Sequence, residues 1–215
     1  MISLAIDTST PRGSVALFAY GDLVFDESFT ADRSHSAALF ASLVRARGCS
    51  GHIHQMAVGL GPGSYAGVRI AIAAALAFDL ALGAKLVGLP SVAALETDAH
   101  EYLAIGDARR NTFYFTHVVE RECVDGPRLL DEHALRELLE TFPSKPCYTQ
   151  EPLAAFPSAQ IAHPSAVILA RLATDGKSIV ANGDLEPIYL REPYITQPAT
   201  RLVYSLEDGI GRDKE

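Results

Sequence analysis

Two aspartates in this chain each follow a short apolar run and have the chemistry to bind a metal ion. Asp7 follows Leu4–Ile6 in the stretch IDTST, and Asp107 follows a similar run in IGDARR. In two-lobed folds that use ATP, carboxylates at such strand ends hold Mg²⁺ or orient water. An aspartate after a strand also readily caps its own turn by accepting backbone N–H bonds, so both interpretations stay open. Together with Thr8, the two aspartates define a candidate nucleotide cleft.

A glycine-rich turn lies between an apolar run and a long alanine-rich segment. Free N–H groups of such a turn could hold an anion at the start of a helix. Its spacing matches neither GxGxxG nor the P-loop, so the alternative is that glycine allows strand and helix to pack closely. The candidate residues of this turn are Gly61, Pro62, Gly63, Ser64, Tyr65, Gly67 and Arg69.

Ser64 in this turn could be a nucleophile or a helix cap. A nucleophile elbow needs glycine two residues before the serine, where this sequence has Pro62. We therefore predict that Ser64 caps the following helix through its side-chain oxygen. The seven histidines include no pair at i and i+4, and the three cysteines lie far apart. We predict no catalytic residue and no metal site.

Composition is that of an ordinary soluble globular protein. Hydrophobic residues make up 48% of the chain and charged residues 20%. The formal net charge of −8 opposes direct binding of a polyanion to the surface as a whole. The N-terminus lacks the pattern of a signal peptide, and the longest apolar run, 70–78, is shorter than the roughly 20 residues that span a bilayer. We expect a cytoplasmic protein without a membrane segment.

The order of apolar runs and turn residues predicts an α/β fold. Short β-rich runs alternate with longer helical patterns, and glycine or proline marks many of their ends. In the first half we expect strands over Leu4–Ile6, Val15–Tyr20, Leu23–Phe29, Met56–Leu60 and Leu86–Leu89. We expect helices over His35–Arg47, with Ser34 as N-cap and Gly48 at its end, and over Val68–Leu82, with Gly83 at its end.

The second half repeats this order in a shorter form, which predicts two related lobes. Here we expect strands over Ala104–Asp107 and Phe113–Val119 and around Cys147 and Ile161, and helices over Ala134–Glu140, capped by Asp131, and Ser165–Thr174. The expected boundaries are residues 1–100 for the first lobe and 101–197 for the smaller second lobe. Residues 198–215 lack periodicity, and we expect a flexible or loosely docked tail.

The alanine-rich helix expected over Val68–Leu82 is apolar nearly all round. Such a helix must be covered on more than one side. The covering elements are either its own sheet and neighbouring helices or, in part, another protein chain. Composition alone leaves both arrangements open.

Six stretches of the chain together resemble the bacterial TsaB (YeaZ) family. They are IDTST at Ile6, SHSAALF at Ser34, VGLGPGSYAGVRIA at Val58, GLPSVAALE at Gly88, DARRNTFYF at Asp107 and LEPIYLR at Leu185. They span nearly the whole chain, and the central stretch is specific to this family and its relatives. The resemblance implies an actin-like fold (ASKHA, ribonuclease H-like) with two related lobes.

The resemblance also implies a function. Family membership implies a non-catalytic scaffold subunit in the synthesis of N6-threonylcarbamoyladenosine, next to the anticodon of tRNAs that read codons starting with A. The implied partners are a TsaD-type catalytic subunit and a TsaE-type ATPase, with tRNA held indirectly through the complex and a homodimer when the partner is absent. The cofactor that is compatible with the resemblance is ATP or ADP, bound at the boundary between the subunits of the complex.

The family's dimer interface is built largely from the two helices of the first lobe. The residues that we expect there are His35, Leu39, Ser42, Ile70, Ala74 and Ala77. On this basis Ala74→Arg is expected to abolish pairing and leave the monomer folded.

This sequence departs from its relatives at two places that matter for chemistry. The catalytic relatives bind a metal through His-x-x-x-His, where this sequence has Pro90 and Ala94, neither of which can coordinate one. Ala66 replaces a common threonine, which removes a hydroxyl from the glycine-rich turn. The rival functions are an actin-like ATPase or small-molecule kinase that uses Asp7 and Asp107 with magnesium, and a metalloprotease-like activity.

Overall fold

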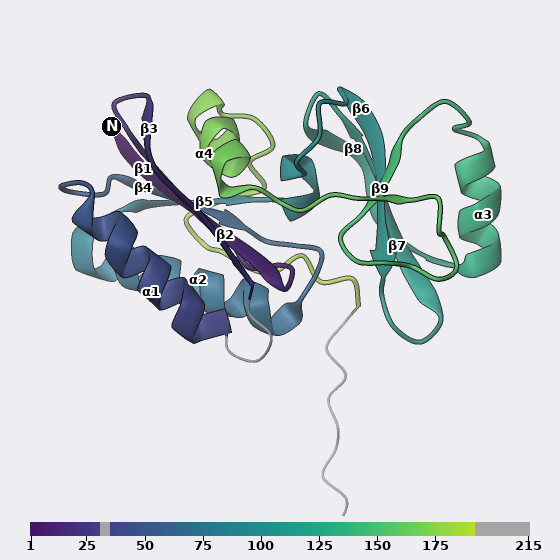
Figure 1. Ribbon diagram of the computed structural model, residues 1–215, viewed down its shortest axis with the longest axis horizontal. Helices are drawn as coiled ribbons and strands as arrows, with labels where there is room; N and C mark the ends of the chain where they lie inside the picture. Colours follow the sequence, from purple (N-terminus) through teal and green to yellow (C-terminus); the bar gives the residue numbers. More distant parts are fainter. Residues whose placement is uncertain (31–34, 192–215) are drawn as a thin grey trace, which may run out of the picture.

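The computed structural model describes residues 1–30 and 35–191, which form two α/β lobes lying side by side (Figure 1). Within these residues the first lobe has a six-stranded sheet in the order β11-β5-β4-β1-β2-β3, and the second a five-stranded sheet in the order β10-β9-β6-β7-β8. In the first sheet β1 pairs in parallel with β4, and β4 with β5, whereas β2, β3 and β11 are antiparallel to their neighbours. Ser34 and the tail 198–215 lie outside the described residues.

The first lobe contains most of the elements expected from the first half of the sequence. Its strands are β1 (Ile2–Asp7), β2 (Arg12–Ala19), β3 (Asp22–Thr30), β4 (Gln55–Gly59), β5 (Lys85–Leu89) and β11 (Ala181–Asn182). Its helices are α1 (His35–Gly48), α2 (Tyr65–Leu82) and α4 (Ala166–Asp175), and a 3₁₀ turn, η1 (Ser91–Ala94), follows β5. The prediction for α2 began three residues too late, because the first turn of the helix lies inside the glycine-rich stretch.

Side-chain size alternates along β1 and decides which helices cover each face of the sheet. Leu4 and Ile6 join the core under α1 and α2, whereas Ala5 faces the opposite side and joins the core under α4. Successive side chains of a strand point to opposite faces, so both faces of this central strand are buried. Figure 1 shows α1 and α2 on one side of the first sheet and α4 on the other.

The second lobe repeats the order strand, hairpin and helix. Its elements are β6 (Glu101–Asp107), β7 (Thr112–Val119), β8 (Glu122–Asp131), α3 (Glu132–Glu140), β9 (Cys147–Thr149) and β10 (Gln160–Ile161). Leu135 of α3 packs with Leu103, Ile105 and Phe115 on one face of the sheet. The predicted cap of α3 is confirmed, because the Asp131 side chain accepts a hydrogen bond from the N–H of Ala134 at 2.8 Å.

The placement of α4 corrects the boundary that was expected between the lobes. The division at residue 100 assigned this helix to the second lobe, but Leu169 and Ala170 pack against Ala5 and Ala57 of the first sheet. After α4 the chain adds β11 to the edge of the same sheet, beside β5. The alanine-lined face of the first sheet must be covered, and α4 is the element that covers it.

Strand β8 was missed by the sequence interpretation. It contains Gly126 and Pro127, which normally mark a turn, and its side chains alternate between exposed and half-buried. Proline is tolerated at the edge of a sheet, where a missing N–H costs no ladder bond, and β8 is an edge strand. The pattern of this segment therefore resembled a loop.

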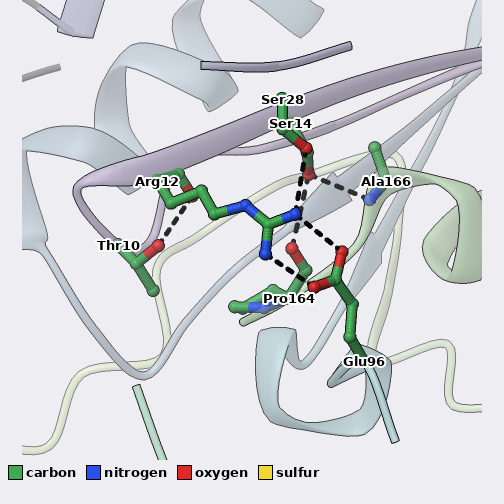
Figure 2. A network of polar contacts seen from close by, with 7 residues as sticks. All are labelled: Thr10, Arg12, Ser14, Ser28, Glu96, Pro164 and Ala166. Carbon is green, nitrogen blue, oxygen red and sulfur yellow. Dashed lines mark hydrogen bonds and ion pairs between the residues drawn. The ribbon is translucent and has the colours of Figure 1, made fainter. Parts of the chain in front are cut away.

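A network of polar contacts holds the lobes together where the chain passes from one to the other (Figure 2). Arg12 at the start of β2 makes an ion pair with Glu96, with Nη1–Oε2 and Nη2–Oε1 distances of 2.6 and 3.1 Å. Ser14 Oγ accepts a hydrogen bond from the N–H of Ala166 at 2.9 Å and donates to the carbonyl of Pro164 at 3.4 Å. Strand β2 is thus bound to both segments that connect the lobes, the one after η1 and the one that leads into α4.

Helix α2 has the length and hydropathy of a possible membrane span. The sequence did not suggest one, because the longest uninterrupted apolar run, 70–78, is much shorter than a span. The 18 residues of α2 have a mean hydropathy of 1.7, and 33% of them are buried within the described residues. The helix connects the parallel strands β4 and β5 and also carries Arg69 and Asp79. Its apolar surface is therefore divided between the core of the first lobe and an outer face.

Candidate functional site

The glycine-rich turn packs directly against the turn that joins β1 and β2. A Cβ atom at Gly67 would lie 1.9 Å from the carbonyl oxygen of Thr8, and one at Gly63 would lie 2.2 Å from that of Ser9. The N–H of Ser64 donates to the Ser9 carbonyl at 2.6 Å. Contacts this short between two backbones leave no room for a side chain, so close packing explains the two glycines.

The N–H groups of this turn are largely used inside the protein. Gly61 N donates to Ser91 Oγ at 2.9 Å, and Gly67 N donates to Ser64 Oγ at 3.2 Å. The second contact confirms Ser64 as the N-cap of α2, and Gly83 ends the helix in the left-handed conformation as expected. Because these donors already have partners, they are not free to hold a phosphate.

Asp7 is buried at the end of β1 rather than exposed in a cleft, and a Cβ atom at Gly59, the last residue of β4, would lie 1.8 Å from its Oδ2. The residue is 1% exposed, and Oδ1 accepts hydrogen bonds from the N–H and the hydroxyl of Ser9 at 2.8 and 2.7 Å. Within the described residues Oδ2 has no hydrogen-bond partner. Burial raises the pKa of Asp7, and the nearby hydroxyls of Ser91 and Ser9 offset part of the rise.

Thr8 also has a structural role. It is fully buried, and its hydroxyl donates to the carbonyl of Gly67 at 2.7 Å. The expectation that Asp7 and Thr8 contribute to an open nucleotide cleft is therefore wrong for the described conformation. The Thr8 hydroxyl instead holds the start of α2 against the β1–β2 turn.

Asp107 occupies the corresponding position in the second lobe but faces a cleft. Its Oδ1 accepts from the N–H of Arg109 at 2.7 Å, and its Oδ2 pairs with Arg109 Nη1 at 2.9 Å. Arg109, Arg110 and Asn111 follow with φ angles of 65°, 56° and 57°. Three successive left-handed residues other than glycine form an unfavourable turn that neighbouring groups must hold.

The cleft lies between the lobes and has a volume of about 440 Å³. Its first-lobe side comes from the β1–β2 turn and the glycine-rich turn, and its second-lobe side from the ends of β6 and β9. The lining residues are Ser9, Thr10, Pro11, Gly63, Ser64, Tyr65, Gly106, Asp107, Ala108, Arg109, Tyr114, Gln150, Glu151 and Leu190. Asp7 is not among them, so the expected pair of aspartates does not meet there.

Sequence reasoning missed Gln150 and Glu151 as lining residues of the cleft. They follow the short strand β9, which pairs in parallel with β6, so both strands end at the same edge of the sheet. Ligands of α/β sheets often bind at the carboxyl ends of parallel strands. This rule, applied to Asp107 and the strand around Cys147, could have brought both residues into the prediction.

The outer face of α2 is a second candidate site. Beyond the residues that pack on the sheet, the helix exposes Ala66, Ala73, Leu76, Ala77 and Leu80, with Ile70 half-buried between them. Their spacing of three and four residues places them along one side of the helix. Leu80 is 91% exposed, and Val44 of the adjacent helix α1 is 74% exposed. We call these residues of α2, together with Phe40 and Val44 of α1, the apolar face.

The structure separates the expected interface residues into two groups. Leu39, Ser42 and Ala74 are buried inside the first lobe, where Leu39 and Ala74 belong to its core and Ser42 donates a hydrogen bond to Glu27 Oε2 at 3.0 Å. These three residues cannot contact a partner directly in this conformation. Ile70 and Ala77 lie on the apolar face, and the side chain of His35 lies outside the described part of the chain.

The two lobes, with a central sheet in each and a cleft between them, define an actin-like α/β fold. A solved structure of YeaZ from Pseudomonas aeruginosa has the same fold, with a TM-score of 0.68 and 22% identity over 88% of this chain and 99% of that one. A second solved structure, of an uncharacterized protein similar to peptidase YeaZ from the same organism, also has a TM-score of 0.68, with 24% identity.

Sequence similarity defines the family more narrowly than the fold does. The chain is 30% identical to the tRNA threonylcarbamoyladenosine biosynthesis protein TsaB of Haemophilus influenzae, over 87% of this chain and 92% of that protein. An uncharacterized protein of Mycobacterium tuberculosis is 33% identical over 58% of this chain and 62% of its own length. The chain belongs to the TsaB (YeaZ) family.

A related family also matches part of the chain. The family described as TsaD, tRNA N6-adenosine threonylcarbamoyltransferase, matches residues 30–134. Pro90 and Ala94, which the resemblance predicted to stand where catalytic relatives have metal-binding histidines, are buried beside and within η1. Neither side chain carries an atom that binds a metal.

Proposed function

We propose that this chain is a non-catalytic scaffold subunit in the synthesis of N6-threonylcarbamoyladenosine in tRNA. The family relationship supports the pathway, since a relative of similar length is named as a tRNA threonylcarbamoyladenosine biosynthesis protein. The proposed partner is a TsaD-type catalytic subunit, and a TsaE-type ATPase and tRNA would join through the complex. The cytoplasm is the corresponding location.

The single observation that carries the scaffold role is the apolar face on α2 and α1. Leu76, Leu80, Phe40 and Val44 are all exposed on these neighbouring helices. A contiguous apolar surface on a folded protein commonly marks an interface. Complete burial of each large side chain contributes about 1.5–3 kcal/mol, which offsets the loss of translational and rotational freedom on association.

The small residues of α2 favour a helix as the partner element. Ala66, Ala73 and Ala77 lie between the larger Ile70 and Leu80. Alanine allows the axis of a second helix to approach closely, and the larger side chains then fill the grooves beside it. The same face would pair two copies of this chain when the catalytic subunit is absent.

The cleft contains one of the two aspartates that were expected to form a magnesium site. Of the two aspartates that could have formed a magnesium site, Asp7 is 1% exposed and only Asp107 lines the cleft. Across residues 1–30 and 35–191, no group of three His, Cys, Asp or Glu side chains is arranged to hold a metal ion. We also propose that ATP or ADP binds at the boundary between the subunits, where the partner would supply the groups that bind phosphate.

A substitution at Leu80, the most exposed large residue of the apolar face, tests the interface. We expect Leu80→Arg to reduce binding of the TsaD-type subunit at least tenfold, because the interface would have to bury a charge. The thermal unfolding of the isolated chain should hardly change, since the Leu80 side chain is 91% exposed. Val124→Arg is the control, because Val124 is also exposed but lies on β8 of the other lobe.

Size-exclusion elution and titration calorimetry with the TsaD-type subunit measure both variants. Equal binding by Leu80→Arg and the unmodified chain would refute the proposed interface. Ala74→Arg is no longer a suitable test, because Ala74 is 1% exposed in the core and arginine there should prevent folding.

A further inference from the structure

Residues 185–191 cross from the first lobe to the second, and we call this segment the strap. Its first residue, Leu185, is buried in the core of the first lobe. The N–H of Ile188 donates to the carbonyl of Leu60, the residue before the glycine-rich turn, at 2.9 Å. The strap is thus fixed to the first lobe immediately beside α2, and Figure 1 shows the described chain ending between the lobes.

The middle of the strap contacts the outer surface of α2. The ring of Tyr189 lies 5.9 Å from that of Tyr65, measured between centroids, and the Tyr65 hydroxyl accepts a hydrogen bond from Arg69 Nη1 at 2.7 Å. A groove of about 320 Å³ separates the strap from α2, and Leu76 of the apolar face lines it together with Tyr189. The strap therefore forms one edge of the proposed interface.

The far end of the strap is fixed to the second lobe. Leu190 packs against the core formed by β6, β7 and η1 and also lines the cleft. Arg191 Nη2 donates to the carbonyl of Arg109 at 3.3 Å and to the hydroxyl of Thr112. These contacts hold the turn of three left-handed residues at the mouth of the cleft.

We propose that the strap couples the apolar face to the turn at residues 109–111. A catalytic subunit that covers the apolar face and the groove beside it would restrain Tyr189, and through Leu190 and Arg191 it would stabilise the turn. The coupling is reciprocal, so a ligand that orders the turn strengthens pairing by the same factor. This inference rests on the interface proposed above.

The backbone of the turn provides a direct readout of this coupling. Ala108 N donates to the carbonyl of Thr112 at 2.9 Å, and Thr112 N donates to that of Arg109 at 3.2 Å. Both N–H groups exchange with solvent deuterium only when the turn opens. Their exchange rates therefore report the stability of the turn, far from the apolar face itself.

Hydrogen–deuterium exchange of the full chain, alone and with the TsaD-type subunit, tests the proposal. In the unmodified protein we expect the complex to slow exchange of the Ala108 and Thr112 amides at least threefold. Arg191→Ala should still form the complex but lose this slowing. Arg136→Ala is the matched control, because Arg136 also donates to a backbone carbonyl, that of Ala155, but lies on α3.

The outcomes separate the coupling from the interface. If the complex forms and exchange at the turn is unchanged, or slows equally in Arg191→Ala, the coupling is refuted and the interface stands. If no complex forms with the unmodified chain, the proposed function itself is refuted. Slowing that Arg136→Ala retains and Arg191→Ala loses establishes the strap as the connection.

Discussion

The turns that follow the first strands of the two lobes have the same local structure but different surroundings. In each, the aspartate accepts a hydrogen bond from the N–H two residues ahead, at 2.8 Å for Asp7 and 2.7 Å for Asp107. The Asp7 residue is 1% exposed, whereas the Asp107 side chain is 31% exposed. The difference shows that the element packed over a turn, rather than the turn itself, decides whether its carboxylate can meet a ligand.

In the first lobe Asp7 lies against Gly59 at the end of β4, and the glycine-rich turn packs on the two residues that follow Asp7. In the second lobe the turn is instead held by Arg191 of the strap and opens onto the cleft. The duplicated fold has thus given one turn a structural role and left the other accessible. Three predictions test this contrast, in order of decreasing expected effect.

The largest effect is expected from Gly67→Ala, which would disrupt the packing of α2 on the β1–β2 turn. The added Cβ would lie 1.9 Å from the Thr8 carbonyl oxygen, so α2 must move away from the β1–β2 turn. We expect the free energy of unfolding to fall by about 3 kcal/mol, at the upper end of the usual range for overpacking. Urea unfolding followed by circular dichroism measures it.

Gly51→Ala is the control for this prediction. A Cβ at Gly51 would meet no atom within 4 Å, and Gly51 is exposed. Its effect on the free energy of unfolding should stay within about 0.5 kcal/mol. Similar stabilities of the Gly67→Ala and Gly51→Ala proteins would show that the glycine-rich turn is not closely packed.

The second prediction concerns the pH dependence of stability that Asp7 introduces. Because burial raises its pKa above 3.8 in the folded state, the folded protein holds this proton more tightly than the unfolded chain. The stability that this tighter proton binding adds to the folded protein is fully present below pH 3.8 and is lost as the pH rises through the raised pKa. Asp7→Asn keeps the acceptor for Ser9 and does not ionise.

The unmodified protein should therefore lose stability relative to Asp7→Asn as the pH rises from 3.8, by up to about 1.4 kcal/mol per pH unit. Urea unfolding of both proteins across a pH series measures the difference. A relative gain in stability of the unmodified protein over this range would mean that the ionised carboxylate is favoured, contrary to its burial.

The smallest effect is expected at the ion pair that supports the first turn from outside. Arg12 and Glu96 are both partly exposed, and exposed pairs typically contribute about 0.2–1 kcal/mol. A double-mutant cycle with Arg12→Ala and Glu96→Ala should give a coupling energy in this range. A coupling energy several times larger would mean that the contact between the lobes depends mainly on this pair.

Local features of the fold could be predicted from the sequence. The buried strand at Leu4–Ile6 and the caps at Ser64, Gly83 and Asp131 depend on residues close together in the chain, and the structure confirms them. The position of α4 could not be predicted, because its choice between two sheets depends on which exposed apolar face lacks a cover. Strand β8 was hidden by a proline that only an edge strand accepts.

In the candidate sites, too, local features could be predicted from the sequence, whereas contacts between distant segments could not. The glycine-rich turn was located correctly, but its packing on Thr8 and Ser9 depends on a contact between segments more than fifty residues apart. The burial of Asp7 against Gly59 of β4 likewise depends on a contact between distant segments, and it keeps Asp7 out of the cleft. Likewise, the sequence could identify α2 as apolar all round but could not assign Ala74 to the core and Leu80 to the outer face.

The most direct test of the scaffold role is threonylcarbamoyl transfer to tRNA in a reconstituted system. The reaction would contain the TsaD-type subunit, the TsaE-type ATPase and threonylcarbamoyl-adenylate, with this chain as Leu80→Arg, as Asp107→Asn or unmodified. We expect Leu80→Arg to lose at least nine-tenths of the product and Asp107→Asn to retain most of it. Full activity of Leu80→Arg, with loss of activity in Asp107→Asn, would contradict a scaffold role and place the chemistry in the cleft.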